Sequence, residues 1–180
     1  MKRLPILIAV LLSSHPTLAS EVYFSPEGGV QDQIIKRINT SKSFIDMAMY
    51  SFTSGDIAEA LGRASQRGVK IRVVRDAIQS ENKNDENSYL QQNGIHVAIR
   101  SGKGRGIMHD KFAVFDGKEA FTGSYNWTNN AEHNNWENGL FTDEPKIVQA
   151  YQKEFEVLWK APDKTAFSKS KKRRRREGIY

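Results

Sequence analysis

The first half of the chain alternates short apolar runs with segments of helical periodicity. Val69, Ile71 and Val73 alternate with polar residues, as expected of a strand, whereas Ile34 and Ile38 recur at helical spacing. We therefore predict strands over 22–24, 44–50, 69–74 and 95–99, and helices over 30–40, 55–67 and 86–92. Strands that alternate with helices are typical of an α/β sheet with helical crossovers.

The second half of the chain has a different rhythm. Asp116-Gly117 lies between two apolar runs and is a strong hairpin signal, which predicts paired strands over 107–115 and 119–123. Another strand is predicted over 136–142, followed by an amphipathic helix over 144–159. A hairpin added to helical crossovers predicts an α/β fold, an α/β/α sandwich with a mixed central β-sheet.

The two ends of the chain differ from its middle. Lys2 and Arg3 precede an apolar run over 4–12, and small residues at Thr17 and Ala19 complete the layout of a secretory signal peptide. The apolar run is far shorter than the roughly 20 residues of a membrane span. We expect a signal peptide over 1–19, a folded domain over 20–160 and a basic, disordered tail over 161–180. The protein is then periplasmic or secreted, with no stable membrane insertion after signal removal.

The excess of positive over negative charge lies in the tail. The chain has 27 Lys and Arg and 21 Asp and Glu, and residues 160–180 hold nine of the basic and two of the acidic ones. With Lys2 and Arg3 also set aside, 21–159 keeps 16 basic and 19 acidic residues, a net charge of −3. A basic arm on a slightly acidic body suits a polyanion, either nucleic acid or an anionic membrane surface. The expected tail contacts to nucleic acid are Lys171, Lys172, Arg173, Arg174, Arg175 and Arg176.

Reactive side chains concentrate in one stretch of the second half. His109 and Lys111 are two residues apart in a predicted strand, so both should point to the same face. A neutral imidazole beside an ammonium is a poor metal site and a good phosphate site. Lys111 and Asn126 can hold anionic oxygens while His109 attacks phosphorus or moves a proton, and Glu137 can fix the tautomer of the imidazole. The chain has no cysteine, which excludes disulfides and thiolate catalysis, and we expect no cofactor and no metal.

This stretch resembles the HKD signature of the phospholipase D superfamily. The match is His109-x-Lys111-x4-Asp116-x6-Gly123-Ser124-x-Asn126, with every spacing intact, and the likeness covers roughly residues 20–160. The resemblance implies a metal-independent phosphodiesterase with a phosphohistidine intermediate on His109. In it Lys111, Asn126 and Ser124 bind phosphate, Glu137 orients the imidazole, and Asp116 and Gly123 are structural.

The superfamily also implies two motifs for each active site. This chain has one motif, so we expect a homodimer with the active site at its two-fold axis. The single motif in a short chain resembles the small bacterial endonucleases of the superfamily, which implies non-specific cleavage of DNA or RNA. A phospholipase that acts on anionic lipid is the alternative, because the same chemistry and the same tail would serve it. The sequence has no long apolar loop to admit lipid, which favours nucleic acid.

Several residues have two possible interpretations. His133 can serve as a second histidine within the same chain, whereas His96 is read as structural. Lys103 and Arg105 lie in a glycine-rich loop that either contacts substrate phosphates or is only mobile. The aromatic residues Tyr125, Trp127 and Trp136 can stack on bases, but packing in the core or at its rim is the favoured interpretation.

Overall fold

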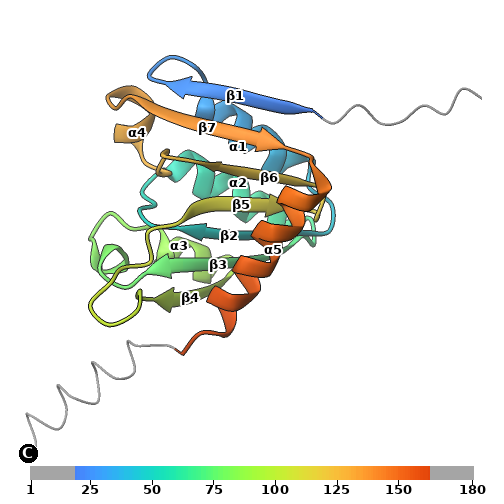
Figure 1. Ribbon diagram of the computed structural model, residues 1–180. Helices are drawn as coiled ribbons and strands as arrows, with labels where there is room; N and C mark the ends of the chain where they lie inside the picture. Colours follow the sequence, from blue (N-terminus) through green and yellow to red (C-terminus); the bar gives the residue numbers. More distant parts are fainter. Residues whose placement is uncertain (1–18, 163–180) are drawn as a thin grey trace, which may run out of the picture.

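A seven-stranded mixed sheet runs through residues 19–162, the part of the chain that this computed structural model describes (Figure 1). The strand order is β1-β7-β6-β5-β2-β3-β4. β2, β3 and β4 run parallel, and the other neighbours are antiparallel. The strands are β1 (Ser20–Ser25), β2 (Phe44–Met49), β3 (Lys70–Asp76), β4 (His96–Arg100), β5 (Lys111–Phe115), β6 (Glu119–Gly123) and β7 (Glu137–Thr142). The expected signal peptide and tail lie almost entirely outside the described residues.

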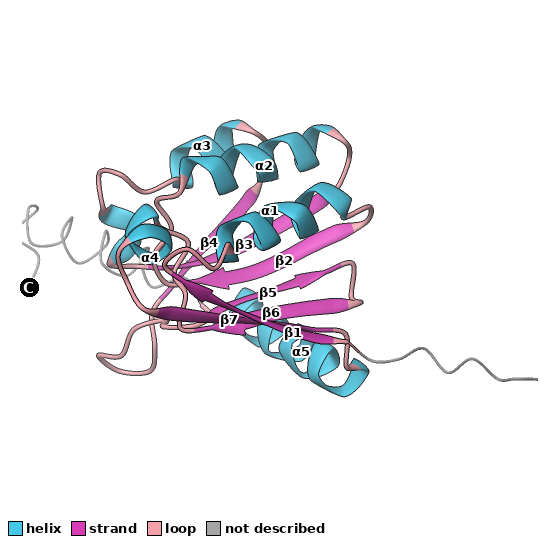
Figure 2. Cartoon of the chain, turned by 90° about the horizontal axis from the view of Figure 1, so that it is seen from above, coloured by secondary structure: helices cyan, strands magenta, loops and turns pink. Residues whose placement is uncertain are grey.

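Helices cover both faces of the sheet (Figure 2). α1 (Val30–Thr40), α2 (Gly55–Gln66) and α3 (Asn87–Gln92) lie on one face, and α5 (Pro145–Lys160) crosses the other against β2, β5 and β6. This arrangement confirms the predicted α/β/α sandwich with a mixed sheet. The sequence did not predict α4 (Asn129–His133) or a 3₁₀ turn over Gln79–Glu81. Within residues 19–162, no helix has the length and apolar character to cross a membrane.

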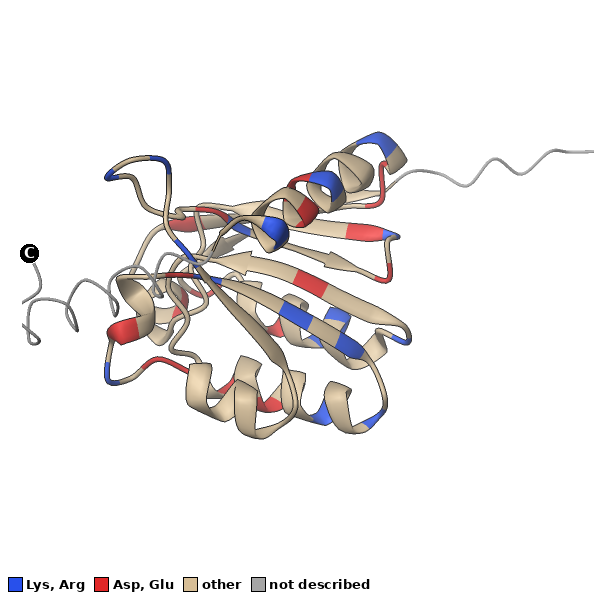
Figure 3. Ribbon diagram, turned by 90° about the horizontal axis from the view of Figure 1, so that it is seen from below, with Lys and Arg blue, Asp and Glu red and all other residues tan. Residues whose placement is uncertain are grey.

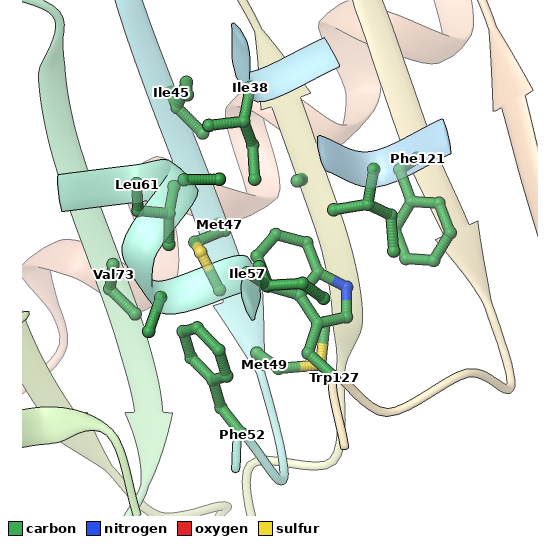
Figure 4. Close-up of a cluster of buried hydrophobic side chains, with 14 of the residues drawn as sticks. Ile38, Ile45, Met47, Met49, Phe52, Ile57, Leu61, Val73, Phe121 and Trp127 are labelled. Atoms are coloured by element: carbon green, nitrogen blue, oxygen red, sulfur yellow. The ribbon is translucent and has the colours of Figure 1, made fainter. Parts of the chain in front are cut away.

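The larger core lies between the sheet and the helices α1 and α2 (Figure 4). Phe52 and Trp127 are fully buried there, with ring centroids 5.5 Å apart in an edge-to-face arrangement. The Trp127 backbone also bonds to the segment after β2, since Thr53 and Ser54 donate to its carbonyl oxygen at 2.9 and 3.0 Å. This core therefore fixes the loops at one end of the sheet, where the motif lies.

The predicted hairpin turns at Asp116-Gly117. Both residues have positive φ, 53° and 65°, as a two-residue hairpin turn requires. The Asp116 carboxylate accepts backbone N–H groups of Lys42, Ser43 and Phe44 at 2.8–3.2 Å, which joins the turn to the start of β2. Burial by itself would raise the pKa of Asp116, but these N–H groups outweigh it and leave the pKa below its usual value.

The first strand of this hairpin is shorter than predicted. Residues 107–115 were expected to be one strand, but β5 begins only at Lys111. The segment before it bonds elsewhere: Ile107 forms an isolated bridge with Ser101, and the Met108 N–H donates to Asp76 at 3.0 Å. The placement of His109 within a strand was therefore wrong, because His109 precedes β5, although its side chain still meets that of Lys111.

Strand direction brings the motif together at one end of the sheet. Because β5 is antiparallel to β2, Lys111 at its start lies opposite Met49 at the end of β2. Gly123 ends β6 at the same level, opposite Gly139 of β7, and Glu137 begins β7. Residues spread over about half of the chain thus meet at the edge where β2 and β3 end.

Candidate active site

His109 and Lys111 meet directly. The Lys111 ammonium donates to the His109 carbonyl oxygen at 3.0 Å and lies 3.5 Å from Nδ1 and 3.4 Å from Nε2 of its ring. The imidazole itself is exposed at the end of the sheet. An anionic oxygen bound by Lys111 would therefore lie within reach of a ring nitrogen.

Burial and nearby negative charges have opposite effects on the pKa of Lys111. Partial burial lowers the pKa of its ammonium below the usual value, while the negative charges of Glu137 and Asp110 act to raise it. An ammonium that has lost part of its hydration gains more from an incoming anion than a fully solvated one does. The site is thus prepared for a phosphate group.

Asn126 and Ser124 come from the segment that follows β6. The Asn126 side-chain oxygen accepts the Ser51 N–H at 3.3 Å, which leaves its NH₂ group as the donor for an anion. The Ser124 hydroxyl oxygen accepts the backbone and side-chain N–H groups of Asn138, at 3.1 and 3.3 Å, so its own proton can be donated. Both predicted phosphate ligands therefore have their acceptor atoms occupied by protein donors.

Gly123 is required by close packing of backbones. A Cβ atom at this position would lie 2.1 Å from the carbonyl oxygen of Asn138 on β7. No side chain can replace glycine here unless β6 and β7 separate. Gly123 therefore lets the Ser124 segment lie tightly against the strand that carries Glu137.

Glu137 lies beside the site, but its contacts differ from the predicted one. Its carboxylate accepts the side-chain N–H of Asn135 at 3.1 Å, and it acts on Lys111 through charge. The expected partner, the His109 imidazole, is in contact with Lys111 and with Tyr50. In this single chain Glu137 thus acts on the Lys111 ammonium through its charge rather than by a direct contact with the imidazole.

Tyr50 is a site residue whose position the sequence analysis missed. Its ring centroid lies 4.4 Å from that of His109, with the planes tilted by 59°, and the Lys111 ammonium lies 5.1 Å from the same ring. Tyr50 follows β2, a strand about 60 residues before the motif. Only the pairing of β2 with β5 brings them together, so no local spacing could have revealed it.

The other candidate residues are distributed around the molecule. Lys103 and Arg105 are exposed on the loop between β4 and β5, and His96 and His133 are also exposed. Tyr125 and Trp127 are buried, so they pack in the core and are not available to stack on bases. Trp136, in contrast, is 89% exposed. The Tyr125 hydroxyl donates to Glu132 at 2.7 Å. The tail residues 171–176 lie outside the described part of the chain.

The surroundings of His109 contain no obvious metal site. In the described residues, no three His, Asp or Glu side chains gather into a group that could hold a metal ion. The donors that do meet at the site are an ammonium, an imidazole, an amide and a hydroxyl. Such a set matches an anion rather than a cation.

The fold and the site together define an α/β protein built for chemistry on a phosphate group. The family model described as "Cardiolipin synthase, PLD-like domain" matches residues 34–159. The chain therefore belongs to this phospholipase D-like family, a superfamily of phosphodiesterase-type hydrolases. The resemblance that the HKD spacing indicated is confirmed.

Relatives and solved structures point to two kinds of protein. Mitochondrial cardiolipin hydrolases are similar, with 40% identity over 124 residues in Xenopus laevis and 33% over 142 in Homo sapiens. These alignments cover 69% and 78% of this chain but only 58% and 56% of the relatives' lengths. Among structures, Nuc from Salmonella typhimurium has 30% identity and a TM-score of 0.73, and NucT from Helicobacter pylori 28% and 0.75. Each structural match covers 79% of this chain, and 94% and 96% of the respective structures.

Proposed function

We propose that the protein is a metal-independent phosphodiesterase that cleaves nucleic acid as a non-specific endonuclease. The observation that carries this proposal is the Lys111 ammonium held against both ring nitrogens of His109. One His109 nitrogen attacks phosphorus and displaces the leaving oxygen, which takes a proton from a second histidine. Water then attacks the phosphohistidine, gives its proton to the second histidine, and frees the first.

The remaining residues bind and orient the reacting groups in this proposal. Lys111, Asn126 and Ser124 donate hydrogen bonds to the non-bridging oxygens, whose charge grows in the transition state. Glu137 supports the Lys111 charge in the single chain. We assign it, by resemblance, the further role of orienting the His109 imidazole.

Nucleic acid is the preferred substrate class, and anionic lipid is the second candidate. The likeness to Nuc and NucT over nearly their whole length, together with exposed Lys103 and Arg105 near the site, supports nucleic acid. Lys, Arg, Asp and Glu are interspersed over the body (Figure 3). A polyanion would therefore bind mainly to the loop that carries Lys103 and Arg105 and to the tail. The cardiolipin hydrolase relatives, and the exposed Ile78, Ile107 and Trp136, favour lipid.

Parallel assays separate the two substrate classes. Plasmid DNA and vesicles that contain labelled cardiolipin are offered to the same enzyme in excess EDTA. We expect DNA cleavage that chelator does not reduce, and little lipid hydrolysis. Activity that EDTA abolishes and a divalent ion restores would overturn the metal-independent mechanism, and hydrolysis of lipid alone would replace nucleic acid with the second candidate.

The homodimer is also part of this proposal, and one surface suits it. On β1 and β7, Tyr23 and Phe141 face α1, while the alternate residues Val22, Phe24 and Leu140 face the side that α5 leaves largely open. Val22 and Phe24 are more than half exposed, and so is Trp136, which immediately precedes Glu137 in the chain. A second copy packed here about a two-fold axis would bury apolar area next to the site.

Replacing Phe24 with aspartate should therefore dissociate the dimer. The charge would lie in the proposed apolar contact, so we expect monomers in sedimentation experiments and a loss of specific activity that rising protein concentration restores. Val157→Asp is the matched control, because Val157 is 63% exposed, like Phe24 at 60%, but lies near the end of α5 that reaches β4, the opposite edge of the sheet. Equal behaviour of the two variants would contradict this choice of surface.

The tail is proposed to raise affinity without entering the chemical step. Each neutralised phosphate adds about 0.9 to the slope of log affinity against log salt on duplex DNA. Deletion of 169–180 should lower that slope by roughly 3–5 if most of its charges bind phosphate, raise KM at moderate salt and leave kcat nearly unchanged. An unchanged slope would remove the tail from the nucleic-acid contacts.

We further propose a periplasmic or secreted location. Comparing digestion of the protein by added protease in intact cells with its digestion in cell extracts would test this location.

A further inference from the structure

Asp76 is a fully buried carboxylate at the end of β3, outside the motif and without a part in the proposed chemistry. Its two oxygens accept three backbone N–H groups. Oδ1 binds those of Ile78 and Gln79, at 2.9 and 3.0 Å, and Oδ2 binds that of Met108 at 3.0 Å. Asp76 therefore joins the turn after β3 to the residue immediately before His109.

The first connection fixes the backbone around His109. Met108 is bonded to Asp76 through its N–H, and its side chain is buried with Val74 and Phe112. On the other side of His109, the carbonyl oxygen of Asp110 accepts the Tyr50 N–H at 2.9 Å. Both neighbours of His109 are thus held in place although this segment belongs to no strand.

The second connection reaches the imidazole ring. Gln79, whose N–H binds Asp76, donates its side-chain amide to the Tyr50 hydroxyl at 3.1 Å. The Tyr50 ring in turn packs on the His109 ring and lies near the Lys111 ammonium. The loop that follows this turn is fastened at its far end, where buried Arg75 pairs with Asp85. Asp76 therefore acts on His109 by two separate routes.

We propose that Asp76 is a positioning residue that sets the place of the His109 imidazole, through Met108 by one route and through Gln79 and Tyr50 by the other. This inference rests on the proposed function, because it takes His109 as the nucleophile. A displacement of about 1 Å at a reacting group can reduce turnover by about 10²-fold. A positioning residue should therefore change kcat more than KM.

Three variants test the proposal on the full-length protein. Asp76→Asn keeps the size of the side chain but replaces one acceptor oxygen with a donor, and we expect kcat to fall about 10- to 100-fold with KM little changed. Gln79→Ala and Tyr50→Phe each remove the hydrogen bond between these two side chains, and Tyr50→Phe keeps the ring that packs on His109. We expect each to lower kcat several-fold, and the double variant to be no worse than either, because both remove the same interaction.

Asp116→Asn is the matched control. Asp116 also accepts three backbone N–H groups, but at the opposite end of the sheet, so its loss should lower the melting temperature without changing kcat. The ring signals of His109 in nitrogen–proton NMR spectra should shift in all three test variants and not in the control. If Asp76→Asn fails to fold, Gln79→Ala and Tyr50→Phe still test the route through Gln79 and Tyr50.

The two proposals can fail separately. Full kcat and unchanged His109 signals in Gln79→Ala and Tyr50→Phe would overturn the route through Gln79 and Tyr50. The same result in Asp76→Asn would overturn the positioning role itself, while His109→Ala stays inactive. Turnover by His109→Ala would instead overturn the proposed function. A loss of kcat in Asp116→Asn equal to that in Asp76→Asn would mean that both carboxylates act only on stability.

Discussion

His109→Ala is expected to abolish turnover and to leave nucleic-acid binding nearly intact. The substitution removes the proposed nucleophile and the proposed acid, and loss of a covalent nucleophile can cost about 10⁶-fold in kcat. Binding should persist because it is spread over many phosphate contacts. Plasmid cleavage and the anisotropy of a labelled oligonucleotide, both at one salt concentration, measure the two quantities.

His133→Ala and His96→Ala are the matched controls for this loss. Both residues are exposed histidines of the same chain, and neither lies against Lys111. We expect both variants to keep nearly full kcat. Substantial activity in His109→Ala would show that another residue is the nucleophile.

Mixing His109→Ala chains with wild-type chains should reduce activity faster than simple dilution. A site at a two-fold axis needs one histidine from each chain, so only wild-type pairs would be active. If chains exchange freely and pair at random, activity follows roughly the square of the wild-type fraction, which is about one quarter for equal amounts. The measurement is initial cleavage rate against mixing ratio after equilibration.

Val157→Asp chains give the control for this titration. They keep His109 and should not lower the activity of the wild-type chains with which they pair. A linear fall with His109→Ala, or a monomer that stays active at high dilution, would point to a second histidine in the same chain, with His133 as the candidate. That result would also mean that pairing through the surface on β1 and β7 is not needed for catalysis.

Local signals in the sequence were sufficient for most of the architecture. The Asp116-Gly117 turn predicted the hairpin because positive φ at both positions is a property of the turn itself. The alternation of Val69, Ile71 and Val73 predicted β3 because these side chains are buried in the larger core, whereas Lys70 and Arg72 between them keep contact with solvent. The prediction failed for residues 107–110, whose backbone bonds to the distant residues Asp76 and Tyr50 instead of extending the strand.

The candidate site was predictable only where its residues share one motif. His109, Lys111, Ser124 and Asn126 have fixed spacing, and the hairpin places them at one end of the sheet. Tyr50 follows β2 and Asp76 ends β3, so their placement near His109 depends on the strand order, which no local pattern encodes.

The most direct test of the phosphohistidine mechanism is to trap the intermediate. Wild-type enzyme is mixed with an end-labelled oligonucleotide in excess EDTA, quenched within milliseconds in alkaline denaturant, and digested for mass spectrometry. We predict a nucleotide phosphoryl group bound to a ring nitrogen of His109, stable in alkali and lost in acid. Rapid cleavage without any adduct on His109, or an adduct on a different residue, would contradict the mechanism.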